Sequence, residues 1–148
     1  SAKYKLIYIV LSVLFIILSA IFKRYIKTNA NYTRNRIKKA GKAANKRLRT
    51  AEKLMHERKV EAFYDEVMRA LLGYAGDKLN MHTVDLTKDN VRQALAQKQV
   101  DNAIIDAYLD IVAQCEYARF APGDPNATMD RIFTEATEAI NKLDTILK

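Results

Sequence analysis

The chain has 148 residues and carries 25 Lys and Arg against 17 Asp and Glu, which gives a formal net charge of +8. Its single cysteine excludes an internal disulfide and fits a reducing compartment. With four glycines and two histidines it contains no Gly-rich phosphate loop, no nucleophile elbow and no histidine at metal-ligand spacing from another ligand. We therefore predict a protein that is not an enzyme and that takes no cofactor.

An uncharged apolar run, LIYIVLSVLFIILSAIF, occupies residues 6–22. Its 17 residues lie at the short end of the range for a transmembrane helix. As a helix they would span roughly 25 Å of hydrocarbon. Tyr4 and Tyr25 flank the run, and tyrosine favours the headgroup level of a membrane. We predict one transmembrane helix over 6–22.

Charge is distributed unevenly around this run. Residues 1–49 contain 13 Lys or Arg and no acidic residue, whereas residues 50–148 contain 12 basic and 17 acidic residues. Because basic residues near a span stay on the cytoplasmic side, we expect a basic juxtamembrane stalk over 23–49 and an acidic cytoplasmic domain over 50–148. Lys23, Arg24 and Lys27 are the expected contacts to anionic lipid headgroups.

Two alternatives to a membrane span are the h-region of a signal peptide and a buried core helix. The run is longer than a usual h-region, and no face of it is polar. The first residue is Ser rather than Met, so we expect a fragment or a processed product whose residues 1–5 form a short extracytoplasmic end.

The stalk is rich in helix formers, and the sequence predicts a solvated helix over residues 29–49 with Thr28 or Asn31 as its N-cap. Nucleic-acid binding is an alternative, because basic patches also pair with phosphate. Residues 29–49 contain Tyr32 as their one aromatic residue and have no recognisable nucleic-acid fold beside them, so we do not expect nucleic acid as a partner.

A helical hairpin follows. Apolar residues give one face to a first helix over 44–55, and Glu57, Arg58 and Lys59 interrupt it. A second helix over 60–79 shows a 3.6-residue period across five turns. Gly73 and Gly76 lie inside this second helix, and we expect each to let a neighbouring helix approach closely. The pair resembles a single tetratricopeptide-type hairpin, although arrays of that type need several repeats.

Three more helices are predicted. The first is capped by Thr87 and runs to about residue 98; the second is capped by Asp101 and ends at residues 120–123, where Pro122 and Gly123 stop it. Residues 124–126 are expected to be a loop, and Asn126 or Thr128 to cap the last helix. The fold class is thus all-α: one transmembrane helix, a basic juxtamembrane helix and a bundle of about five helices that includes the hairpin.

Three stretches carry a family resemblance: residues 61–71 (EAFYDEVMRAL), 86–91 (LTKDNV) and 115–122 (CEYARFAP). In this order, after one span and a basic stalk, they resemble the C-terminal part of the BatD-type aerotolerance proteins of Bacteroidetes. The resemblance implies an export signal and sheet-rich domains N-terminal to this chain, a place in the bacterial inner membrane and a role in oxygen tolerance. It also implies von Willebrand A-type membrane proteins and a MoxR-type AAA+ ATPase as partners, and it implies no enzymatic activity.

Glu116, Tyr117, Arg119 and Phe120 are the candidate contacts to a protein partner, since Tyr, Phe and Arg are enriched at interfaces. The alternative, which we favour from the sequence, is that Tyr117 and Phe120 pack under the turn at Pro122 while Arg119 pairs with an acidic residue. Function is expected to be that of a non-catalytic membrane-anchored adaptor. The alternatives are a redox sensor that uses Cys115, with Arg119 lowering the pKa of its thiol, and a regulator that binds nucleic acid or nucleotide.

Overall fold

A computed structural model describes residues 2–120 and 125–147, and the chain divides into two compact units between Asn35 and Arg36. The first unit consists of most of helix α1 (Ala2–Lys38). Large apolar side chains all along residues 6–22 are exposed, Phe15 at 74% of its surface. Helix α1 is long and apolar enough to cross a membrane, by length and composition. The core-helix alternative is wrong, because no residue of the apolar window is buried; the signal-peptide alternative stays open.

No helix begins at the predicted stalk caps. The hydroxyl of Thr28 donates to the carbonyl of Arg24 at 2.9 Å, a bond made inside a continuous helix, and Asn31 likewise lies within α1. The helix breaks at Lys39 instead, and α2 (Ala40–His56) starts there without a side-chain cap. Ala40, Ala44 and Leu48 are buried, so the second half of the predicted 23–49 stalk is a core helix of the compact unit.

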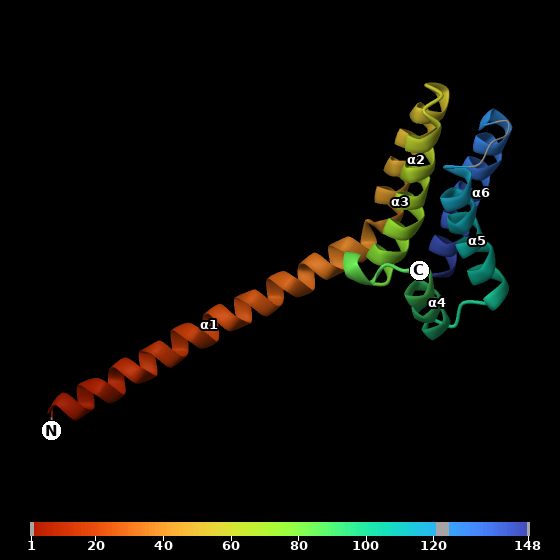
Figure 1. Cartoon of the computed structure of the whole chain (residues 1–148). Coiled ribbons are helices and arrows are strands. Elements are labelled where there is room, and N and C mark those ends of the chain that lie inside the picture. The colour runs from red at the N-terminus through yellow and green to blue at the C-terminus, as the bar shows by residue number, and fades with distance from the viewer. Residues whose placement is uncertain (1, 121–124, 148) are drawn as a thin grey trace. The chain divides into compact units, whose positions relative to one another are not determined.

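The second unit is a helical bundle, as predicted. After α2 come α3 (Val60–Lys78), a short 3₁₀ turn η1 (Thr83–Asp85), α4 (Lys88–Gln97), α5 (Asn102–Ala118) and α6 (Pro125–Ile146). Figure 1 shows α2 and α3 as an antiparallel hairpin, with α5 and α6 beside each other and α4 next to α5. Within the described residues there is no strand, and the five helices of the bundle match the five predicted.

The core lies between the α2–α3 hairpin and helices α5 and α6. Its largest fully buried side chains are Tyr64, Tyr74, Tyr108, Phe63, Leu71, Leu95, Ile105, Met129, Ile132, Ile140 and Leu143. The Tyr108 hydroxyl donates to the backbone carbonyl of Leu71, so this buried phenol has a partner. The buried residues of α3 recur about every 3.6 positions along the helix, as its sequence period predicts.

Helix α6 closes the bundle against α2 and α3. The Asp144 carboxylate accepts a 2.9 Å hydrogen bond from the Tyr74 hydroxyl and lies 3.5 Å from Lys78 Nζ. A Cβ atom at Gly41 would stand 2.9 Å from an oxygen of the same carboxylate. Gly41 thus leaves the room that lets α6 approach α2.

Three helices end in the same way. Arg58, Asn80 and Gln99 have positive φ angles of 57°, 53° and 62°, and each follows the last helical residue by two positions. The next amide donates back to the carbonyl five residues earlier, as Lys59 does to Leu54 at 3.0 Å, Met81 to Gly76 at 2.8 Å and Val100 to Leu95 at 3.2 Å. This is the Schellman motif, with a non-glycine residue in its left-handed position each time.

Helix starts agree with the sequence at two of three positions. The Thr87 hydroxyl accepts from the Asn90 amide at 3.1 Å, and the Asp101 carboxylate accepts from the Ala103 amide at 3.4 Å. Helix α6, however, begins at Pro125, inside the segment predicted to be a loop. Proline suits the first helical position, because its fixed φ is helical and its missing N–H has no partner there. The predicted stop at Pro122 and Gly123 lies outside the described residues.

Candidate functional site

The end of α5 presents two aromatic side chains to solvent. Tyr117 and Phe120 are each 76% exposed; Tyr117 is in the last turn of α5, and Phe120 follows the last helical residue, Ala118, by two positions. The expectation that they pack under the turn at Pro122 stays a prediction, because Pro122 lies outside the described residues. We call these two residues the α5 aromatic pair.

Arg119 is held firmly beside this pair. Its guanidinium lies 3.0 Å from the Asp65 carboxylate and 3.6 Å from that of Glu61, both on α3, as the predicted pairing with an acidic residue requires. The guanidinium carbon is 5.1 Å from the centre of the Phe120 ring, a cation–π distance. Its Nε is buried without a hydrogen-bond partner among the described residues. Phe120 is therefore exposed but rests on an ordered cation.

Glu116 belongs to a different contact. It accepts a 2.9 Å hydrogen bond from Lys88 at the start of α4, and both side chains are close to half exposed. The four candidate residues thus lie at or just after the end of α5, where Arg119 lies against the Phe120 ring and Glu116 links α5 to α4. Aromatic rings, a guanidinium and carboxylates of this kind suit association with a protein surface rather than a covalent reaction.

Cys115 is buried in the core. Burial, with a smaller contribution from Glu116, raises the pKa of its thiol to about 12. Arg119 does not produce the lowered pKa on which the redox-sensor hypothesis depends, because its guanidinium is paired with Asp65. A buried thiol with a raised pKa is a poor nucleophile and is slow to oxidise.

Lys23, Arg24 and Lys27 are exposed on α1, next to the apolar run. Their expected contact with lipid headgroups stays a prediction.

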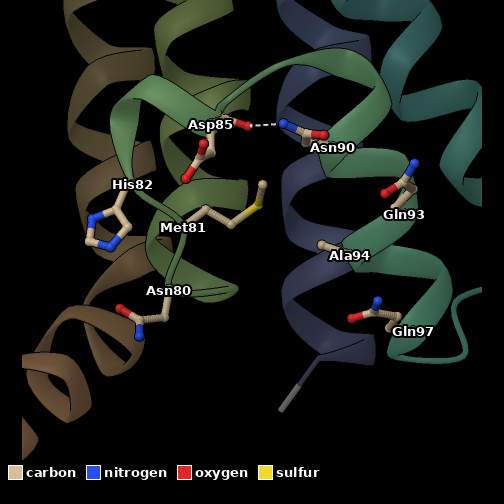
Figure 2. Close-up of a pocket in the computed structure, with 8 residues that line it drawn as sticks. All are labelled: Asn80, Met81, His82, Asp85, Asn90, Gln93, Ala94 and Gln97. Atoms are coloured by element: carbon tan, nitrogen blue, oxygen red, sulfur yellow. Dashed lines mark hydrogen bonds between the residues drawn. The ribbon is translucent and has the colours of Figure 1, made fainter.

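A polar pocket of about 350 Å³ lies between the segment after α3 and helix α4 (Figure 2). Asn90 closes part of it by donating to the Asp85 carbonyl at 2.9 Å. The side chains of Asn80 and His82 point away from α4 in Figure 2, so the polar groups of the two sides do not converge on one point. In the described part of the chain, no group of three or more His, Cys, Asp or Glu residues is placed to hold a metal ion.

Two groups of residues are not predicted by the sequence. One is the contact of Asp144 with Tyr74 and Lys78, which joins residues far apart in the chain. The other is a cavity lined by arginines from α1, α2 and α3. The one sequence signal for that cavity is Gly73 in α3, and a glycine there indicates only that a neighbouring helix has room to approach.

No protein-family model, no curated protein and no solved structure matches the chain.

Proposed function

We propose that this chain is a non-catalytic, single-pass membrane-anchored adaptor that docks a protein partner through the α5 aromatic pair. Residues 6–22 form the membrane anchor in this proposal. The helical bundle lies on the cytoplasmic side of a bacterial inner membrane. The observation that carries the proposal is the presence of two rings, each 76% exposed, one of which, Phe120, lies against a guanidinium that Asp65 already holds.

Energetics support this choice of surface. Exposed aromatic rings lose much apolar area to a partner, and aromatic and arginine residues dominate the binding energy of many interfaces. Two ion pairs hold Arg119, so part of the ordering cost of association is met before a partner arrives. The acidic side chains of Glu61 and Asp65 beside the pair favour a partner that presents a basic residue.

The resemblance to BatD-type proteins supplies candidate partners. These are a von Willebrand A-type membrane protein and a MoxR-type AAA+ ATPase, in a membrane complex that contributes to oxygen tolerance. Both assignments belong to the proposal and rest on the three short stretches that carry the resemblance.

The test is site-specific photo-crosslinking in the native cell. A photoreactive phenylalanine replaces Tyr117 or Phe120 in the full chain, and the crosslinked species are identified by mass spectrometry. Val84 is the matched control position, because it is an apolar residue of the same unit, 88% exposed, on η1 rather than α5.

The expected result is one protein captured from positions 117 and 120 but not from position 84. Tyr117→Ala and Phe120→Ala in an otherwise unlabelled chain should then lower its recovery together. Equal capture from all three positions, or capture of nucleic acid or lipid alone, would contradict the proposed docking surface.

A further inference from the structure

A second cavity, of about 510 Å³, opens on the other end of α3 from the aromatic pair. Its lining includes three arginines, Arg36, Arg47 and Arg69, together with one acidic residue, Asp77. All three arginines belong to the compact unit that starts at residue 36. The volume lies in the range of small-ligand pockets.

The three guanidinium groups differ in how far their charge is compensated. Arg36 donates to the Asp77 carboxylate at 2.8 Å and to the Met81 carbonyl at 2.8 Å, so it is a structural link. Arg47 forms a longer ion pair, with its Nη1 3.6 Å from a Glu66 carboxylate oxygen, and its side chain is about half exposed. Arg69 has no ion pair or hydrogen bond to any described residue. Two guanidinium groups therefore retain donors for a ligand.

Apart from Thr83, the rest of the lining is apolar. Met68, Leu72 and Leu86 supply partly buried side chains. At Gly73 the missing side chain leaves space, because a Cβ added there would have Arg47 Nε, 3.7 Å away, as its nearest neighbour. An anionic group at the arginines would thus have room for an attached apolar group beside it.

We propose that this cavity binds a phosphate ester that carries a short apolar substituent. A phosphate monoester has a charge of about −1.5 to −2 at neutral pH, and Arg69 together with the remaining N–H donors of Arg47 offers the cationic groups to meet it. Guanidinium groups bind phosphate oxygens through paired N–H donors. Such an ester is found both in soluble metabolites and in anionic lipid headgroups, and the experiment separates these sources.

The probe is n-butyl phosphate, titrated into the full chain in nanodiscs of zwitterionic phosphatidylcholine. Binding is followed by calorimetry and by the NMR signals of the arginine Nε–H groups. Two variants test the site: Arg69→Gln removes an uncompensated cation, and Gly73→Leu fills the cavity while every charge remains. Their matched controls are Arg49→Gln, an exposed arginine of α2 outside the cavity, and Gly73→Ala.

We expect n-butyl phosphate to bind more tightly than inorganic phosphate. Arg69→Gln and Gly73→Leu should each weaken binding by roughly tenfold or more, and the two controls should leave it unchanged. Equal loss in Arg49→Gln would mean unspecific attraction to basic charge, and unchanged binding in Gly73→Leu would place the ester elsewhere. Either result overturns the proposal, as does binding of an acidic peptide with no binding of n-butyl phosphate.

The source follows from a second set of nanodiscs that contain phosphatidic acid, whose headgroup is a phosphate monoester like the probe. If the lipid headgroup occupies the cavity, the Arg69 signal shifts without added probe and n-butyl phosphate binds more weakly. If a soluble ester is the ligand, the titration is the same in both nanodiscs. Each of these outcomes supports a phosphate-ester site, because each requires that the probe bind in zwitterionic nanodiscs first.

Discussion

The three left-handed helix ends make a sharp prediction about stability. Arg58 and Gln99 hold positive φ angles that cost an L-residue about 1–2 kcal/mol, whereas glycine adopts them freely. Glycine also gives the unfolded chain more freedom, which costs about 0.5–1 kcal/mol. Arg58→Gly and Gln99→Gly should therefore each raise the free energy of unfolding by about 0.5–1 kcal/mol.

Asn80 offers an internal comparison at the third motif. Asparagine tolerates the left-handed region better than arginine or glutamine, so less strain is relieved there. Its side chain also accepts a 3.4 Å contact from Arg36, which glycine would lose. Asn80→Gly should change stability by close to zero. The negative control is Lys98→Gly, because Lys98 has a right-handed φ of −84°, and this substitution should cost about 0.5–1 kcal/mol.

The assay is equilibrium urea unfolding of the full chain in a nonionic detergent. Near-ultraviolet circular dichroism of the buried tyrosines reports on the bundle, whereas far-ultraviolet dichroism would be dominated by total helix content. The strain argument fails if Lys98→Gly stabilises as much as Gln99→Gly, or if Arg58→Gly lowers the urea midpoint.

Three other results are expected. Burial raises the pKa values of Tyr64, Tyr74 and Tyr108 above the ordinary tyrosine value of 10, so their contribution to stability is complete below pH 10 and declines as the pH rises above it. The urea midpoint, measured from pH 8 to 12, should therefore fall only above pH 10, and a flat profile would contradict this. Cys115 should resist iodoacetamide in the folded chain and react at once in urea, and rapid labelling of the folded protein would show that the thiol is accessible. Gly73→Ala should raise the free energy of unfolding by up to about 1 kcal/mol, since a Cβ meets only an ordinary contact there, and a lower urea midpoint would show hidden crowding.

Local pattern is enough to predict most of the bundle. The spacing of apolar residues in α3, α5 and α6 and the capping chemistry of Thr87 and Asp101 depend on neighbours within a few turns, which a sequence displays directly. The charged residues at 57–59 predict the hairpin turn, although nothing in them indicates the left-handed conformation of Arg58.

The features that could not be predicted from the sequence depend on how the helices are placed in the tertiary structure. The charge pattern of residues 23–49 resembles a solvated stalk, yet small residues such as Ala40 and Ala44 pack into the core because α3 and α6 lie against them. In the sequence, Tyr117 and Phe120 cannot be told apart from the buried aromatic residues of the bundle. Only the placement of the other helices shows that nothing among the described residues covers them. Arg47 and Arg69 are 22 positions apart, so no local pattern joins them in one cavity.

The contact between Asp144 and Gly41 has a consequence for the way this domain is made. The α2–α3 hairpin depends on contacts between neighbouring segments, which form early because they close short loops. Residues 41 and 144 are separated by about one hundred positions, and their meeting completes the core. On the ribosome, the apolar faces of α2, α3 and α5 that α6 covers stay in contact with water until α6 has been synthesised. A nascent chain that pauses before α6 should therefore be the form most prone to chaperone binding and aggregation.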